Sequence, residues 1–275
     1  MAYHAPASLK EALDRLAEKD MRVVAGGTDV YPAQGAAPFG GDILDLTRIA
    51  ALQGISRAAE GWRIGATTTW TQIARADLPP AFDGLRAAAR EVGSIQIQNA
   101  GTVAGNLCNA SPAADGVPPL LTLEARVELT STTGQRVLPL AEFLTGVRRT
   151  ALQPGELVSA LLLPDPPAHA RGAFDKLGAR RYLVISIAMV AVVIGCDAQG
   201  RIDHACVAVG ACSPVAQRLS ALECDLIGQR PDQVAVTPAH LTPLSPIDDV
   251  RGSAGYRLDA VAEQIARAIR AAGGQ

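Results

Sequence analysis

The sequence predicts an α+β protein built from more than one structural unit. Short apolar runs typical of strands recur along the chain, and helical stretches lie between and after them. The 275 residues suffice for two compact units, since domains usually contain about 100 to 200 residues. A proline-rich stretch, Pro164-Asp165-Pro166-Pro167, marks the main boundary, because prolines resist both helix and central strand.

The N-terminal part predicts a small β-α-β unit. Ser8-Leu9-Lys10-Glu11 has the form of a capping box, and apolar residues then recur at helical spacing, which predicts a helix over residues 8–19. An apolar run at residues 21–25 breaks at Gly26-Gly27, as a buried strand does on entering a tight turn. A second short strand is expected at residues 42–46.

Later elements are expected on the same grounds. The strands expected before the proline-rich stretch are residues 62–65, 125–130, 136–139 and 157–163, and the helices are residues 71–76 and 85–92. After it, the expected strands are residues 184–196 and 201–210, and the helices are residues 214–224 and 258–272. This order predicts a strand-rich C-terminal layer with helices on one side.

Composition and charge exclude several classes of protein. A formal charge of -2 with 48% hydrophobic and 19% charged residues is typical of a globular protein. Because no basic stripe is present, we expect no nucleic-acid partner. Residues 1–10 lack the features of a secretory signal, so we expect a cytoplasmic protein. The longest apolar stretch, residues 182–195, has roughly 14 residues and is too short for a membrane span of ~20.

The titratable residues form no pattern typical of hydrolysis or metal binding. The five cysteines contain no CxxC pair, and the four histidines are scattered outside the glycine-rich segments. The sequence shows neither a nucleophile elbow nor a close carboxylate pair. This favours a protein whose bound cofactor does the chemistry. Cys108 differs from the other cysteines because it stands in a glycine-rich segment, and its role stays open.

Two glycine-rich segments are the candidate binding sites. The first, residues 23–30 (VVAGGTDV), places two glycines after a strand, where successive backbone N–H groups can face one anion; a plain turn is the alternative. The second, residues 97–115 (IQNAGTVAGNLCNASPAAD), predicts a long functional loop, with a structural or interface loop as the alternative. Together they predict a dinucleotide whose pyrophosphate lies between them. Neither contains lysine, so neutral hydrogen bonds would hold it.

These segments resemble a known family. Ala25-Gly26-Gly27-Thr28-Asp29, Thr102-Val103-Ala104-Gly105-Asn106 and Ser111-Pro112-Ala113-Ala114-Asp115 resemble the FAD-binding medium subunit of the xanthine dehydrogenase and carbon monoxide dehydrogenase family of molybdenum hydroxylases. The resemblance covers nearly the whole chain, including Glu156-Leu157-Val158 and Phe174-Asp175-Lys176 with Arg180. It implies a two-subdomain FAD-binding fold of the vanillyl-alcohol-oxidase (PCMH-like) type, followed by an α+β C-terminal domain with a small antiparallel sheet packed on helices. The implied domains are FAD-binding subdomains at residues 1–55 and 56–168 and a flavoprotein C-terminal domain at residues 169–275.

The resemblance also implies the residues that hold FAD. One side of the pyrophosphate would be wrapped by Val23, Val24, Ala25, Gly26, Gly27, Thr28 and Asp29, and the other by Gly101, Thr102, Val103, Ala104, Gly105 and Asn106. Ser111 offers a further polar group, Asp115 matches a position that hydrogen-bonds the cofactor, and Val158 and Lys176 match positions near the isoalloxazine ring. The alternative for Lys176 is a solvated surface lysine. Ala104 departs from the family, which often has glycine there; alanine would cost about 1 kcal/mol if φ were positive.

The function implied by the resemblance is electron transfer. Substrate would be oxidised at a molybdenum cofactor in a large subunit, electrons would pass through two [2Fe-2S] clusters in a small subunit, and FAD in this chain would receive them. NAD+, oxygen or another acceptor would then reoxidise the flavin. We expect a heterotrimer or a dimer of heterotrimers. We expect FAD as the only cofactor of this chain, because the cysteine-rich insertion that holds an iron–sulfur cluster in 4-hydroxybenzoyl-CoA reductases is missing. The organic substrate and the acceptor stay open.

Two other functions compete with this one. A self-contained flavoenzyme like the UDP-N-acetylenolpyruvoylglucosamine reductases would need a placed acid and a basic pocket, and the sequence indicates neither. An assembly scaffold that has lost FAD would have little physical reason to keep two open, polar glycine segments.

Overall fold

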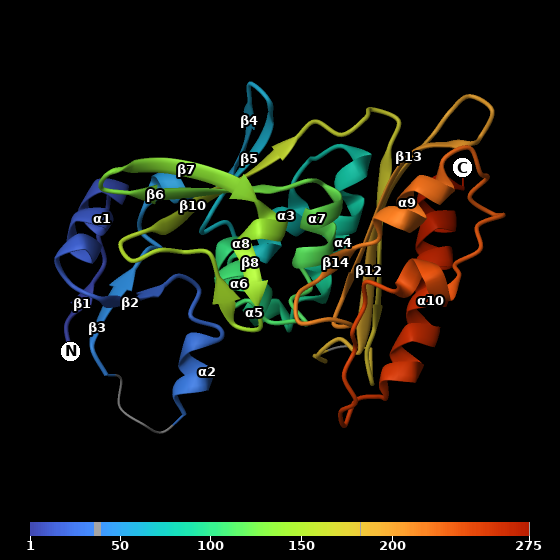
Figure 1. The fold of residues 1–275 in the computed structure, drawn as a ribbon. Helices are drawn as coiled ribbons and strands as arrows, with labels where there is room; N and C mark the ends of the chain where they lie inside the picture. Colours follow the sequence, from blue (N-terminus) through green and yellow to red (C-terminus); the bar gives the residue numbers. More distant parts are fainter. Residues whose placement is uncertain (36–39, 182, 275) are drawn as a thin grey trace.

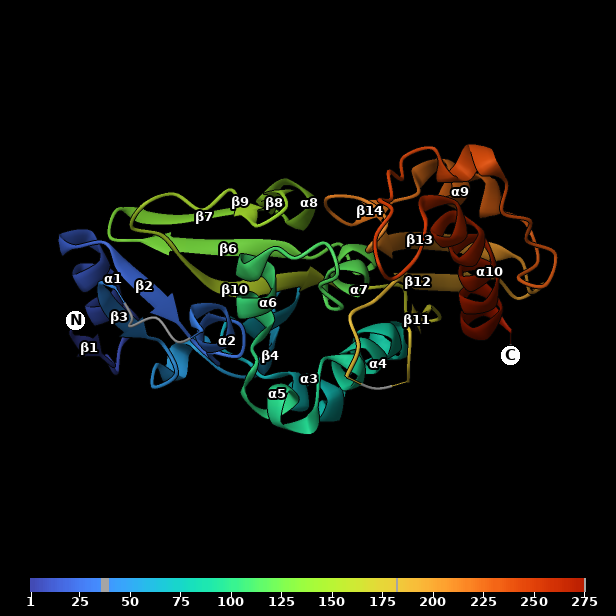
Figure 2. The same ribbon diagram turned by 90° about the horizontal axis from the view of Figure 1, so that it is seen from below.

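Three sheets follow one another along the molecule (Figure 1). The computed structural model describes residues 1–35, 40–181 and 183–274. A small parallel sheet stands at one end, a five-stranded antiparallel sheet in the middle and a four-stranded antiparallel sheet at the other end. Figure 2 shows the same order from below. The predicted α+β class is confirmed.

The first sheet has the order β1-β3-β2, with all pairs parallel. Its strands are β1 (Tyr3–His4), β2 (Met21–Val24) and β3 (Asp42–Asp45); helix α1 (Leu9–Glu18) precedes β2 and helix α2 (Val30–Gln34) follows it. Ser8 Oγ accepts a hydrogen bond from the Glu11 N–H at 3.2 Å, as the capping pattern predicted. The helix and the two strands predicted here are confirmed to within one residue at each end.

The middle sheet has the order β4-β5-β10-β6-β7. Its strands are β4 (Ile55–Ala58), β5 (Gly61–Gly65), β6 (Arg126–Ser131), β7 (Gly134–Pro139) and β10 (Leu157–Pro164). Around it lie helices α3 (Trp70–Arg75), α4 (Asp83–Glu91), α5 (Ile95–Ala100), α6 (Val103–Asn109), α7 (Val117–Thr122) and α8 (Leu140–Phe143), and the small hairpin β8 (Leu144–Gly146) and β9 (Arg149–Thr150). Strand β10 is central, and its first five residues are buried, as expected of a strand covered on both faces.

The last sheet is covered by helices on both faces. Its strands are β11 (Arg171–Leu177), β12 (Ala188–Cys196), β13 (Ile202–Gly210) and β14 (Gln217–Arg218), and helices α9 (Ser220–Leu226) and α10 (Ala254–Gly273) lie on the outer face (Figures 1 and 2). On the inner face, α4 contacts β11 and α7 contacts β12 and β13. The sequence predicted helices on one side of this layer. The outer face carries the two helices predicted after the strands, and the helices on the inner face come from earlier in the chain.

The long loop predicted at residues 97–115 is wrong in its first half. Helices α5 and α6 occupy residues 95–100 and 103–109, and Val103 and Leu107 are fully buried. Ser94 and Thr102 cap these helices, because each side-chain oxygen accepts a hydrogen bond from the N–H three residues on, at 3.4 and 3.2 Å. Capping and burial therefore support helices that composition alone does not favour.

Two other expectations differ from the structure. The helix predicted at residues 214–224 begins only at Ser220, because Gln217-Arg218 pair with β13. The strand predicted from residue 184 begins at Ala188, and β11 was missed because its sequence alternates small, charged and apolar residues without a clear period. A boundary between residues 55 and 56 would fall inside β4, and the three-part division stays a proposal. Within the described ranges, no helix is both long and apolar enough to cross a membrane.

Candidate functional site

The structure brings the two glycine-rich segments to one cavity. Residues 23–30 form one wall, and Gly101, Thr102, Gly105 and Asn106 form the facing wall. The cavity has a volume of ≈ 300 Å³, and we call it the glycine cavity. It lies where β2 ends and α2 has not yet begun, so the backbone there belongs to neither element.

The first segment lines the glycine cavity and carries backbone N–H groups that have no acceptor among the described residues. In the described part of the chain, the backbone N–H groups of residues 26–29 donate to no protein acceptor. Gly27 has a φ of +69°, a conformation that side chains with a Cβ rarely adopt. A Cβ on Gly26 would lie 1.9 Å from the carbonyl oxygen of Ala100. Gly26 therefore allows the close approach of the two segments, and Gly27 allows the backbone conformation of the turn.

In the second segment, the backbone N–H groups of residues 103–106 are already paired with protein acceptors. The N–H groups of Val103 and Ala104 donate to the carbonyl oxygens of Thr68 and Ala66, at 3.0 and 3.1 Å. The Gly105 N–H donates to Thr102 Oγ1. What this segment offers is the side chain of Asn106, whose Oδ1 is buried without a hydrogen-bond partner among the described residues. An orphaned buried oxygen costs free energy unless a ligand completes it.

A smaller cavity of ≈ 150 Å³ continues from the glycine cavity, and we call it the side cavity. The two cavities share the lining residues Val23, Ala25, Thr102, Gly105 and Cys108. Ala104, Leu157 and Val158 line the side cavity, which places the start of β10 beside the glycine segments. The two cavities therefore adjoin along the two glycine segments.

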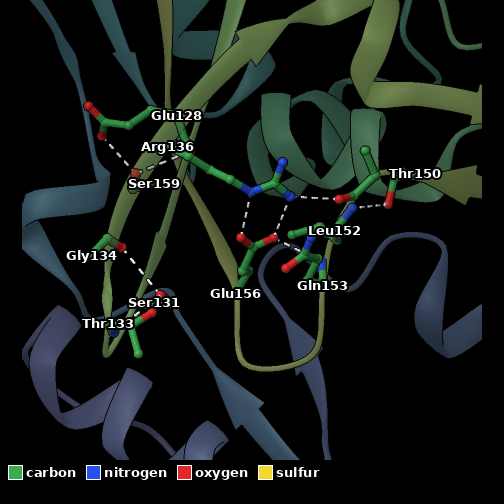
Figure 3. A network of polar contacts seen from close by, with 11 residues as sticks. Glu128, Ser131, Thr133, Gly134, Arg136, Thr150, Leu152, Gln153, Glu156 and Ser159 are labelled. Carbon is green, nitrogen blue, oxygen red and sulfur yellow. Dashed lines mark hydrogen bonds and ion pairs between the residues drawn. The ribbon is translucent and has the colours of Figure 1, made fainter.

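An ion pair fixes the loop that leads into this wall (Figure 3). Arg136 Nε and Nη2 donate to the two carboxylate oxygens of Glu156 at 2.7 and 2.8 Å. Arg136 also donates to the Ala151 carbonyl, and the Gln153 N–H donates to Glu156. The Arg136 guanidinium lowers the pKa of the Glu156 carboxyl below its ordinary value. Because Glu156 itself lines the side cavity, this network holds that wall in place.

Asp115 and Lys176 lie together, away from both cavities. Lys176 Nζ donates to Asp115 Oδ2 at 2.6 Å and to the Glu91 carbonyl at 3.1 Å, and Ser186 donates to Asp115 Oδ1 at 2.6 Å. Burial raises the pKa of the Asp115 carboxyl, against the ammonium and the hydroxyl that favour its charged form. The side chain of Lys176 is 6% exposed, so the alternative of a solvated surface lysine is wrong.

Thirteen of the seventeen predicted binding residues line the two joined cavities. Of the other four, Val103 is buried in α6, Ser111 lines a different cavity, Asp115 is buried in its ion pair, and Lys176 lines a separate ≈ 540 Å³ cavity with Arg90 and Arg180. Val30, Ile97 and Asn109 also line the glycine cavity and lie in the two candidate segments, although no individual role was predicted for them. The residues that sequence reasoning missed are mostly apolar, namely Leu46, Ala66, Thr67, Trp70, Val92, Leu152, Glu156 and Leu157. Apolar side chains at a cavity look like core residues in a sequence, so no pattern marked them.

Two residues singled out in the sequence have clear surroundings. Ala104 lies inside helix α6, where φ is negative, so the strain expected for a positive φ does not arise. Cys108 is an exposed residue that lines both cavities, and desolvation raises the pKa of its thiol to about 12. It is therefore a neutral thiol at physiological pH. Within the described ranges, no group of three or more histidine, cysteine or acidic residues is arranged to hold a metal ion.

Two family models match the chain. The FAD binding domain in molybdopterin dehydrogenase matches residues 1–166, and the CO dehydrogenase flavoprotein C-terminal domain matches residues 173–272. Together they span both sides of the proline-rich stretch.

Several characterised proteins are similar over much of their length. The nicotine 6-hydroxylase medium subunit of Paenarthrobacter nicotinovorans is 31% identical, with 98% of this chain and 96% of that protein covered. The xanthine dehydrogenase FAD-binding subunit of Escherichia coli O157:H7 is 34% identical over 74% of this chain and 69% of that protein. Among solved structures, a chain of the carbon monoxide dehydrogenase from Oligotropha carboxidovorans superposes with a TM-score of 0.91 at 27% identity, with 99% of this chain and 97% of that chain covered.

Proposed function

This chain belongs to the xanthine dehydrogenase and carbon monoxide dehydrogenase family as an FAD-binding medium subunit, and we propose that it is the electron-transfer subunit of a multi-subunit molybdenum hydroxylase. The observation that carries the proposal is that residues 26–29, whose backbone N–H groups have no acceptor among the described residues, line the glycine cavity together with the small residues of the second segment.

The residues present fit FAD. Backbone N–H groups without protein acceptors suit the oxygens of a pyrophosphate, and no lysine is among the described residues that line the two cavities, so neutral hydrogen bonds would hold it. Two adjoining cavities leave room for the two parts of a dinucleotide, and the buried Asn106 Oδ1 has no hydrogen-bond partner among the described residues. The thirteen predicted residues that line the space are the proposed binding residues.

Each wall has a different task in this proposal. Residues 26–29 hold the phosphates by neutral hydrogen bonds, which stay unchanged with pH. Trp70, Val92 and Ile97 exclude water from the other side of the glycine cavity. Bound FAD supplies the redox chemistry. Asp115 and Lys176 form one buried ion pair, and Lys176 also donates to the Glu91 carbonyl. In this proposal the pair fixes the position of β11 against α4.

We further propose the partners and the direction of transfer. A small subunit with two [2Fe-2S] clusters would deliver electrons that a large subunit takes from the organic substrate at its molybdenum cofactor. NAD+ or another acceptor would receive them from this chain. The support is that relatives are named as medium subunits, such as the carbon monoxide dehydrogenase medium chain of Hydrogenophaga pseudoflava, and a name of that kind implies further subunits.

The test is the visible spectrum of the purified chain, with the released cofactor identified by mass. We expect close to one FAD per chain in the wild type and its loss in Gly27→Trp, because a Cβ at Gly27 would lie 2.3 Å from the Tyr31 ring. The matched control is Gly228→Ala, which has a similar φ of +83° and open space around it.

The outcomes separate the three candidate functions. A yellow wild type that co-purifies with two partners supports the subunit. A yellow protein that is active alone supports the self-contained flavoenzyme. A colourless wild type that also refuses added FAD would overturn the proposal in favour of the scaffold.

A further inference from the structure

We infer that Arg148 is a positioning residue for FAD, which turns the side-chain amide of Asn109 so that its NH2 group is offered to the pyrophosphate. Arg148 lies in the turn between β8 and β9, and Asn109 is the last residue of α6 and lines the glycine cavity. Arg148 itself lines neither of the two adjoining cavities. The inference rests on the proposed function, because it adds a residue to the binding of FAD proposed there.

Arg148 holds the end of α6 by three hydrogen bonds. Its Nη1 donates to the carbonyl oxygen of Asn109 at 3.1 Å and to Oδ1 of the same residue. Its backbone N–H donates to the carbonyl oxygen of Ala110, the residue that caps the helix, at 2.9 Å. The end of α6 that lines the glycine cavity is therefore fixed by a residue from the β8–β9 hairpin.

The guanidinium decides which end of the Asn109 amide is left for a ligand. A guanidinium carries only donors, whereas an amide has an oxygen that accepts and an NH2 group that donates. Because Arg148 holds Oδ1, the NH2 group points away from the guanidinium, and it donates to no acceptor among the described residues. Since Asn109 lines the glycine cavity, this NH2 group is what its side chain can offer to an anion there.

The same contact compensates negative charge beside a cavity that lacks cations. None of the described residues that line the two adjoining cavities is a lysine or an arginine, and Asp29 and Glu156 contribute carboxylates. Carbonyl oxygens at the end of a helix carry partial negative charge, so a free Asn109 carbonyl would repel a phosphate. Arg148 pairs this carbonyl with a positive charge, and we expect it to favour binding of an anion.

The backbone of Arg148 has a conformation that favours glycine. Its φ is +58°, which costs a residue with a Cβ free energy that glycine does not lose. Strained residues of this kind persist where the surrounding structure compensates them, and they cluster at binding sites. The compensation here is the contact of the guanidinium with Asn109, which glycine would lack. Arg148→Gly removes the strain together with the contact, so it separates stability from binding.

The test combines titration of the FAD-free chain with FAD and urea unfolding of the same FAD-free protein. We expect Arg148→Gly to weaken FAD binding about tenfold, the effect of losing a hydrogen bond to a charged group. Its unfolding midpoint should change little, because relief of the positive φ offsets the lost hydrogen bonds. Arg148→Lys keeps a cation with several donors and should bind FAD within about threefold of the wild type.

Two further variants control for charge and for the route through Asn109. Arg149→Met removes the neighbouring exposed charge, which lines none of the cavities described above, and it should bind FAD like the wild type. Asn109→Ala should weaken FAD binding as Arg148→Gly does. The double variant of Asn109→Ala and Arg148→Gly should lose no more affinity than Arg148→Gly alone, because Arg148 acts through Asn109.

Each outcome separates this inference from the proposed function. If the wild type binds FAD and Arg148→Gly binds it equally well, the inference is wrong and the proposed function stands. Equal losses in Arg148→Gly and Arg149→Met, or additive losses in the double variant, would also overturn the inference, because Arg148 would then act by net charge or by another route. A joint fall of FAD affinity and unfolding midpoint that Arg148→Lys does not restore would show a purely structural role. A wild type that refuses FAD would overturn both.

Discussion

Asp115 and Lys176 are separated by 61 residues in the sequence and joined by a 2.6 Å contact in the fold. Each is buried, and each would be an uncompensated charge without the other. The family resemblance marked both positions in the sequence, but no pattern along the chain shows that they form a pair. Contacts between distant residues depend on how whole elements pack, which local spacing does not specify.

We predict that Lys176→Met destabilises the protein by about 3–5 kcal/mol, the usual cost of breaking a buried ion pair. Without the ammonium, the already raised pKa of the Asp115 carboxyl rises further. A group whose pKa is raised in the folded state stabilises the fold at low pH, and that contribution is lost as the pH rises through the folded-state pKa. The deficit against the wild type should therefore be small in acid and grow toward neutral and alkaline pH.

Urea unfolding of Lys176→Met across that pH range measures the effect. The control is Asp115→Asn combined with Lys176→Met, which removes both charges and should recover part of the lost stability. Equal destabilisation of the single and double variants at every pH would show that packing, and not charge, accounts for the loss.

Cys108 offers a chemical probe of the glycine cavity. Cys108 is exposed and lines both adjoining cavities, while Cys224 is exposed in α9 and lines neither. We predict that bound FAD shields Cys108 from N-ethylmaleimide and that removal of FAD opens it, with slow labelling because the pKa of the thiol is raised to about 12. Peptide mass spectrometry measures both sites, and Cys224 should label equally in both states. If Cys108 is labelled at the same rate with and without FAD, the cofactor does not bind in the glycine cavity.

Helices α5 and α6 show where local pattern stops being informative. Strands such as β2 and β10 could be predicted because continuous apolar runs end at glycine or proline. Residues 95–109 carry few strong helix formers, and their helices depend on two caps and on burial of Val103 and Leu107. Composition therefore located the site correctly while giving the wrong local structure for one of its walls.

The effects of the two N-cap residues on stability and on FAD binding can be separated by substitution. We predict that Thr102→Ala and Ser94→Ala each cost about 1 kcal/mol of stability, because each removes an N-cap oxygen. Thr102 lines both joined cavities and Ser94 lines neither, so only Thr102→Ala should also weaken FAD binding. Urea unfolding of the FAD-free chain and titration with FAD measure the two effects. Equal loss of FAD affinity in both variants would mean that α5 shapes the cavity as much as α6 does.

At the scale of the whole molecule, the two halves share packing across the proline-rich stretch. Val193, Cys206 and Ala208 of the last sheet belong to the same continuous core as the middle sheet and its helices. The sequence indicates a boundary at residues 164–167, but it does not show that α4 and α7 dock on β11, β12 and β13. This docking depends on backbones that approach closely, and glycine spacing alone does not reveal which backbones meet.

Gly172 lies at the closest of these approaches. A Cβ there would lie 2.3 Å from the Ala81 carbonyl oxygen and 2.9 Å from the Gly84 nitrogen, so Gly172→Val must push β11 away from the start of α4. We predict that the wild type unfolds in urea with coincident transitions by fluorescence and circular dichroism, and that Gly172→Val separates them. Both tryptophans, Trp62 and Trp70, lie in the middle part, whereas circular dichroism reports on the whole chain. The control Gly255→Val has no described atom within 4 Å of its new Cβ and should keep one transition. Coincident transitions in Gly172→Val would show that the halves stay coupled without this contact, and that the shared core around Val193 carries the coupling alone.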